Sequence, residues 1–141
     1  MTQRVANAAK GAAEPVRATL PAQFTILGHA VSVGHSYTPV GSRLVKTKER
    51  KEWDAMMISQ LREQWNLRLP VEEEVFLIVD VYIAANTMDE DNPLKPVQDA
   101  LQEAGFLKND RLVRRATITK HVDRHKPRVE IVVYPSTLKP L

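Results

Sequence analysis

A chain of 141 residues with 43% hydrophobic and 26% charged residues can bury one core and is too short for two domains of ordinary size. It contains no cysteine, which excludes disulfides and thiolate metal sites. No apolar run approaches the roughly 20 residues that span a bilayer, and the N-terminus lacks a signal-peptide core. We therefore expect a single cytoplasmic domain without membrane contacts.

The first residues, 1–21, are rich in alanine and lack a core pattern, so we expect a flexible or frayed arm. The folded domain is expected at 22–136 and a short tail at 137–141. A first strand is predicted over 23–33, followed by a loop that Gly34, Pro39 and Gly41 indicate.

Thr47 is placed to cap a helix predicted over 48–66. One face of this helix carries large apolar side chains that we assign to the core: Trp53, Met56, Met57, Leu61 and Trp65. Its entry carries five basic residues that form a candidate phosphate-contacting patch: Arg43, Lys46, Lys48, Arg50 and Lys51.

Residues 75–85 carry the strongest strand pattern and are apolar on both faces, which predicts a central strand. Asp80 within it is expected to be paired or at an edge rather than catalytic. The strand leads to Asp89 and Asp91, which project to the same face of an extended segment because they are two residues apart. The preceding glutamates of 72–74 are expected in a solvated connection.

A second helix is predicted from the spacing of four apolar residues: Leu94, Val97, Leu101 and Ala104. Gly105 is expected to end it, and Phe106 and Leu107 to fold back onto the core before the chain reaches Asp110. If the ends of this helix converge, Asp110 can join the earlier pair of aspartates.

Hard cations such as Mg²⁺ take carboxylate ligands, so Asp89, Asp91 and Asp110 form a candidate metal site. Lys95, one turn beyond Asp91, is placed to neutralise a scissile phosphate. A purely structural role also fits these residues. Asp91 with Asn92 would then cap the helix, Asp89 would lie in a solvated loop, and Asp110 would be a turn residue.

The C-terminal part is predicted to form two strands, 112–122 and 128–134, joined as a hairpin. Arg114, Arg115 and Lys120 would remain available to DNA. A net charge of −8 over residues 72–110 beside +6 over 111–128 suits a metal together with phosphate, although charged runs are often only solvated faces. His121 and His125 straddle a strand and a turn, so they do not predict a zinc site.

The order of these elements predicts an α+β fold, α/β-like in its alternation, with two main helices packed on a mixed sheet. The pattern D-x-D-N-x-x-K-x-x-x-D-A-L, followed by A-G-F-x-x-x-D, resembles the RusA family of Holliday junction resolvases, small endonucleases of phage and prophage origin. The resemblance is close over residues 76–120 and schematic elsewhere.

The resemblance implies that Asp89, Asp91 and Asp110 are essential carboxylates, that Lys95 is an essential lysine and that Lys120 is a further lysine on the next strand. It also implies Mg²⁺ as the cofactor, with Mn²⁺ as a possible substitute, and a homodimer with two active sites. Asn109 departs from the family pattern, which usually has an acid there. The Asn-rich loop of many members is not evident in 33–40.

We therefore expect a Mg²⁺-dependent endodeoxyribonuclease that resolves four-way junctions by paired hydrolytic nicks, in recombination and repair in a bacterial host. DNA contacts are expected from five basic residues: Lys46, Lys48, Arg114, Arg115 and Lys120. Two alternatives stay open: a nuclease of the same chemistry that acts on other branched or single-stranded DNA, and a DNA-binding module without catalysis.

Overall fold

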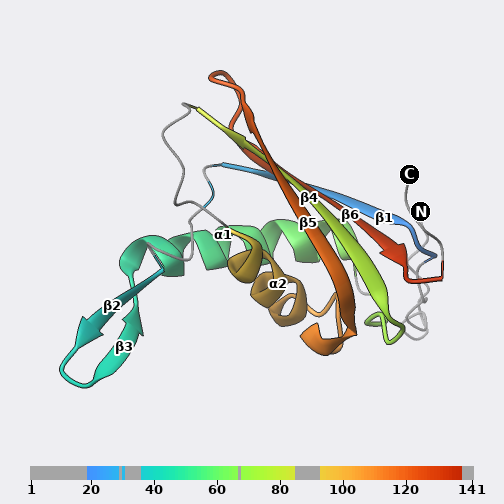
Figure 1. The fold of residues 1–141 in the computed structure, drawn as a ribbon, viewed down its shortest axis with the longest axis horizontal. Coiled ribbons are helices and arrows are strands. Elements are labelled where there is room, and N and C mark those ends of the chain that lie inside the picture. Colours follow the sequence, from blue (N-terminus) through green and yellow to red (C-terminus); the bar gives the residue numbers. More distant parts are fainter. Residues whose placement is uncertain (1–18, 29, 31–35, 67, 85–92, 138–141) are drawn as a thin grey trace, which may run out of the picture.

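The computed structural model describes residues 19–28, 30, 36–66, 68–84 and 93–137. In chain order the elements are β1 (Ala22–Leu27), β2 (Tyr37–Val40), β3 (Arg43–Lys46), α1 (Lys48–Trp65), β4 (Val75–Ile83), α2 (Leu94–Glu103), the 3-10 helix η2 (Asp110–Leu112), β5 (Val113–Val122) and β6 (Arg128–Pro135). Both α-helices lie on one face of a mixed four-stranded sheet (Figure 1). The predicted fold class is confirmed.

The four-stranded sheet has the order β1-β6-β4-β5, with β5 parallel and β6 antiparallel to β4. The predicted hairpin of the last two strands is therefore wrong, because β4 lies between them. Two strand spacings amount to roughly 10 Å. The connection at 123–127 is long enough to cross that distance at the end of β4.

Strand β4 is central, as predicted, and its alternation explains why. One set of its side chains is buried under the helices: Val75, Leu77, Val79, Val81 and Ile83. The alternate set, which includes Ile78, Asp80 and Tyr82, is half-buried on the opposite face. A strand that is apolar on both faces is most stable with neighbours on both sides.

The first strand is shorter than predicted and ends at Leu27. Gly28 follows with φ 119°, and a side chain at this position would come within 2.9 Å of Met56 Sδ. The outer edge of β1 is covered by two glutamines of α1. Gln64 pairs with the backbone N–H and C=O of Thr25, and Gln60 does the same for Leu27.

The loop predicted around Pro39 and Gly41 is instead a β-hairpin, β2–β3, in which Val40 pairs with Arg43. Gly41, with φ 64°, occupies the two-residue turn, where glycine accepts a positive φ without strain. A two-stranded ribbon has two edges, so Pro39 is tolerated within it. The remaining part of the predicted first strand, 29 and 31–33, lies outside the described residues.

The core lies between the sheet and the helices. Thr47 caps α1 by accepting a hydrogen bond from Arg50 N, and the predicted apolar stripe is buried apart from Met56, which is partly buried. Phe106 fits edge-on between Trp65 and Phe24, with ring centroids 4.5 and 4.9 Å away. Neither described α-helix is long and apolar enough to cross a membrane.

Candidate active site

Helix α2 presents a row of polar side chains on one face. It begins at Leu94 after Pro93, whose carbonyl accepts the Val97 N–H over 2.9 Å, so Lys95 lies in the first turn. Residues three and four apart share a helix face, which aligns Lys95, Asp99 and Gln102. The four predicted apolar positions pack on the other side against the core.

The chain returns along this polar face after the helix ends. Gly105, with φ 87°, follows the last turn, and buried Phe106 and Leu107 fix the chain to the core as predicted. Asp110 N–H then donates to Gln102 Oε1 over 3.1 Å. The carboxylate of Asp110 lies 3.7 Å from Lys95 Nζ, an ion pair rather than a hydrogen bond.

Asn109 shapes the turn that presents Asp110. Its side-chain oxygen accepts the N–H of Arg111 over 2.8 Å and so caps the 3-10 helix η2. An aspartate would offer the same acceptor. Asparagine, which stands here in place of the family's usual acid, therefore keeps the hydrogen bond that shapes the turn before β5.

The other two members of the predicted metal site, Asp89 and Asp91, lie outside the described residues. Within the described ranges, no three His, Asp or Glu side chains come together in a way that could hold a metal ion. The structure thus brings together Lys95 and Asp110 of the predicted site. The roles of all four residues stay predictions.

Lys95 belongs to a row of alternating charges that crosses from β3 through α1 to α2. Lys46 contacts Asp54 over 2.9 Å, Asp54 contacts Arg50 over 2.7 Å, and Arg50 contacts Asp99 over 3.0 Å. The second oxygen of Asp99 accepts a hydrogen bond from Lys95 over 2.8 Å. The Asp99 carboxylate thus links Lys95 of α2 to Arg50 of α1.

Arg50 is the buried centre of this row, with 0% of its surface exposed. The prediction that it contacts phosphate is therefore wrong. Burial, the largest influence, lowers the pKa of Arg50, but hydrogen bonds to Asp54 and Asp99 outweigh it and leave the pKa raised. One nitrogen, Nη1, has no hydrogen-bond partner within the described structure. The spacing of Arg50 from Trp53 and Met57 places it on the apolar stripe of α1, a signal that the sequence did contain.

The pKa of Lys95 is raised by its hydrogen bond to Asp99, which outweighs partial burial, and by the charges of Asp99 and Asp110. Lys95 therefore stays protonated at neutral pH and acts as a cation, not as a base. The two acids differ in their availability. Asp99 is engaged by two cations, whereas the Asp110 side chain is 39% exposed and meets Lys95 only at 3.7 Å.

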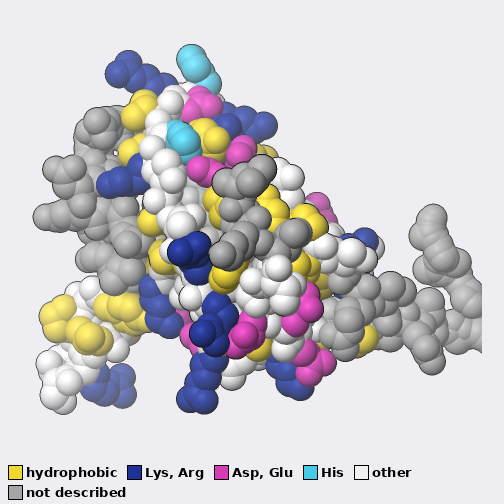
Figure 2. Space-filling model, turned by 45° about the vertical axis from the view of Figure 1, so that its right-hand side comes forward, with side chains coloured by type: hydrophobic (Ala, Val, Ile, Leu, Met, Phe, Trp, Pro, Cys, Tyr) yellow, Lys and Arg dark blue, Asp and Glu magenta, His cyan; other side chains and the backbone are white. Residues whose placement is uncertain are grey.

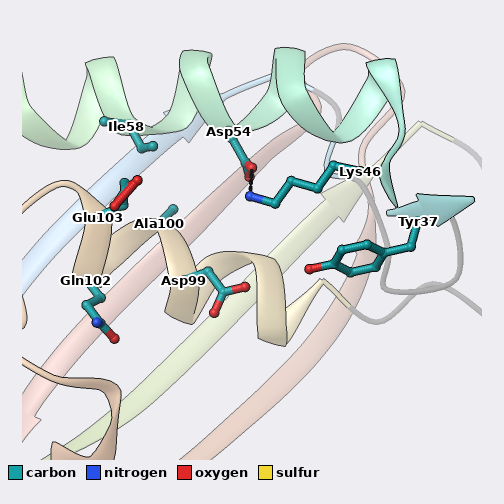
Figure 3. A pocket seen from close by; sticks show the side chains of 8 residues that line it. All are labelled: Tyr37, Lys46, Asp54, Ile58, Asp99, Ala100, Gln102 and Glu103. Atoms are coloured by element: carbon teal, nitrogen blue, oxygen red, sulfur yellow. Dashed lines mark hydrogen bonds and ion pairs between the residues drawn. The ribbon is translucent and has the colours of Figure 1, made fainter. Parts of the chain in front are cut away.

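A cleft of about 360 Å³ lies beside this row, between α1 and α2. Figure 3 shows Asp99 on α2 below Asp54 on α1, with Tyr37 of the hairpin at one end. The lining residues are Tyr37, Lys46, Asp54, Ile58, Asp99, Ala100, Gln102 and Glu103. The root of the hairpin thus belongs to the same region as the polar face of α2.

The basic residues expected to contact DNA are distributed over several elements. Lys46 is held by Asp54, and Lys48 is exposed at the start of α1. Arg114 is paired with Glu74 at the start of β5, and Arg115 lies 5.7 Å over the Phe76 ring. Basic and acidic side chains are interleaved on the face shown in Figure 2.

Lys120 lies near the end of β5, opposite Val81, on the face of the sheet that the helices cover. The next residue, His121, is on the opposite face, where its Nε2 lies 2.8 Å from Asp80 Oδ1. Asp80 is therefore paired, as predicted.

Most of the chain matches one family of known proteins. Residues 30–134 match the family model of endodeoxyribonuclease RusA. A crossover junction endodeoxyribonuclease RusA from Aquifex aeolicus (strain VF5) is 29% identical over 100 residues, which cover 69% of this chain and 77% of that protein. The family match runs from before β2 nearly to the end of strand β6 and includes Lys95, Asp99 and Asp110.

Proposed function

Because the chain belongs to the RusA family of endodeoxyribonucleases, we propose that it resolves four-way DNA junctions by hydrolysing one phosphodiester bond in each of two opposed strands. As an endodeoxyribonuclease it is a hydrolase, and its class of substrate is DNA. The observation that carries the proposal is the approach of Lys95 and Asp110, which lie at opposite ends of the α2 segment in sequence and 3.7 Å apart in space.

The donor set suits a hard divalent cation. Asp110 has an accessible carboxylate, and Asp89 and Asp91, which follow β4 in the sequence, would add two more carboxylate ligands. These three residues would hold Mg²⁺, with Mn²⁺ as a substitute that accepts the same ligands. The bound ion supplies Lewis-acid polarisation of the phosphodiester. Asp99 is unsuited to this role because its oxygens already bind two cations.

Lys95 would place its ammonium on the scissile phosphate. Its side chain is 56% exposed, and its raised pKa keeps the charge in place through the neutral range. Positive charge fixed at the site where negative charge develops stabilises the transition state without reorganisation. Asp99 holds the ammonium in position, so the lysine need not be ordered when the substrate binds.

DNA binding would use exposed basic side chains that neutralise backbone phosphates. Lys46 and Lys48 lie on the hairpin side of the cleft, and Arg114, Arg115 and Lys120 lie along β5. A homodimer would place two such sites about a two-fold axis, which matches the symmetry of a four-way junction and the need for two nicks.

Cleavage of a synthetic four-way junction with Mg²⁺ tests the proposal. The native protein should introduce paired nicks, and Asp89→Asn, Lys95→Ala and Asp110→Asn should each lose cleavage by about 100-fold or more while junction binding remains. Binding without cleavage by the native protein would favour a DNA-binding module. Equal cleavage of linear duplex would contradict junction selectivity, and preferred cleavage of flaps or single strands would point to the other nuclease substrates.

A further inference from the structure

The β2–β3 hairpin forms an arm that is separate from the main sheet. Among the described residues its strands pair with each other alone, and Figure 1 shows them extending beyond the start of α1. Strands of four residues are about 13 Å long, so the turn stands roughly 10 Å away from the root at Tyr37 and Lys46. Every residue of the two strands is exposed except Val45, which is partly buried.

This arm concentrates the exposed apolar side chains of the described structure. Large hydrophobic residues are strongly exposed at five described positions, and three of them belong to the arm: Tyr37 at 41%, Val40 at 57% and Leu44 at 72%. The other two, Leu27 and Val122, are on separate strands of the main sheet. Figure 2 shows hydrophobic side chains at the outer end of the arm, at the lower left.

The register determines what the tip presents. Pro39 pairs with Leu44 and Val40 with Arg43, and paired side chains lie on the same face of the ribbon. One face of the tip therefore carries Pro39 and Leu44, and the opposite face carries Val40 and Arg43. No acidic residue occurs from Ser36 to Lys48, whereas Arg43, Lys46 and Lys48 are basic. The arm thus carries apolar side chains at its tip, with one basic side chain beside them and two more at its root.

This combination fits DNA better than a protein. Stable protein interfaces bury about 800 Å² on each partner, which the end of such a short ribbon does not offer. Two copies of the arm would also bring like charges together. Apolar side chains such as Leu and Pro insert between base steps in DNA, and neighbouring Arg or Lys residues neutralise the phosphates.

The arm is connected to the candidate active site at its root. Tyr37 and Lys46 line the same cleft as Asp99, the residue that holds Lys95. DNA whose backbone reaches Lys95 would therefore pass close to the tip. A branch point exposes base faces that a continuous duplex keeps stacked, so an apolar tip gains contact there without the full cost of unstacking.

We propose that the tip of the β2–β3 arm, Val40 and Leu44, packs against base faces exposed at a DNA branch point, with Arg43 on an adjacent phosphate. The arm then distinguishes branched from continuous DNA. This inference rests on the proposed function for the type of DNA, but it concerns binding and can be tested without cleavage.

The test uses a four-way junction with 2-aminopurine at the branch point and a linear duplex of the same sequence, both without divalent metal. Binding of the native protein should raise 2-aminopurine fluorescence in the junction. The double variant Val40→Ser with Leu44→Ser should lose this rise and bind the junction roughly tenfold more weakly, with duplex affinity changed less than about twofold. Leu44→Met should retain both signals.

Leu27→Ser is the matched control, because Leu27 is similarly exposed but lies on β1. Unchanged junction affinity and fluorescence in the double variant would overturn the inference. A lower molecular mass of the double variant in sedimentation would also overturn it, because a second copy of the chain would then cover the tip. A native protein that gives the fluorescence rise but no cleavage with Mg²⁺ would contradict the proposed function and leave the arm's role supported.

Discussion

Arg50 donates a hydrogen bond to Asp99 over 3.0 Å, and the other oxygen of Asp99 accepts one from Lys95 over 2.8 Å. One carboxylate thus links a fully buried cation in α1 to an exposed ammonium at the start of α2. A buried guanidinium has little freedom to move, so it fixes Asp99 and, through Asp99, Lys95. Asp99 is in this sense a positioning residue for the candidate active site.

Replacing Asp99 with Asn should lower the pKa of Lys95, because the largest cause that raises it is removed. Lys95 stays charged in the native protein until the pH rises above its ordinary value of 10.5, so any loss of function with rising pH should begin earlier in the variant. The pH dependence of the Lys95 side-chain ¹³C chemical shift measures the pKa directly.

The same Asp99→Asn variant should cleave junctions roughly 10- to 100-fold more slowly with little change in junction affinity, because the lysine is present but misplaced. Glu103→Gln is the control, because Glu103 lines the same cleft. In the described structure the Glu103 backbone carbonyl accepts a hydrogen bond from Arg62, and the Glu103 carboxylate makes no ion pair with Lys95. An unshifted Lys95 pKa together with native cleavage rates would show that Asp99 has no positioning role.

Arg50→Met should destabilise the fold by about 3 kcal/mol. The substitution leaves Asp54 and Asp99 without their shared cation, although both keep contact with water, which places the cost at the lower end of the range for a broken buried pair. Urea unfolding measures the change. Lys108→Met removes the exposed pair with Glu72 and should cost less than about 1 kcal/mol. Equal effects of the two substitutions would contradict the buried role of Arg50.

Gln60→Met combined with Gln64→Met should expose the edge of β1. The two side chains make four hydrogen bonds to the strand backbone, so their loss should destabilise the protein by about 2 kcal/mol. An unpaired strand edge also recruits other chains, and we expect concentration-dependent association in light scattering. Glu63→Met on the same helix serves as the control, and an unchanged mass and stability of the double variant would rule out edge protection.

The sequence predicted those features that depend on local patterns. Alternation identified β4 as the central strand, the spacing of apolar residues identified α2, and Gly105 marked its end. The motif that resembles the RusA family also singled out Lys95 and Asp110, which the fold brings together.

Features that depend on long-range pairing were not predictable in the same way. β4 lies between β5 and β6 because it is apolar on both faces and is stabilised most by neighbours on both sides. In the sequence, two strands with a short connection look like a hairpin whether or not they pair. The β2–β3 arm was missed because Pro39 and Gly41 are typical of loops. Arg50 was assigned to the surface because charged residues are rarely buried. Its spacing from Trp53 and Asp54 was visible in the sequence, but its second partner, Asp99, lies on another helix and was not.

Asn109 provides a test of how the turn before β5 presents Asp110. Asn109→Asp keeps the acceptor for Arg111 N–H, so it should retain native stability and cleavage within about threefold. Asn109→Ala removes the acceptor and should cost about 1 kcal/mol in urea unfolding. Because small displacements of catalytic groups are costly, it should also slow junction cleavage by roughly tenfold. If Asn109→Asp raised cleavage well above the native rate, a second acid would contribute to catalysis directly, and the capping role alone would not explain this position.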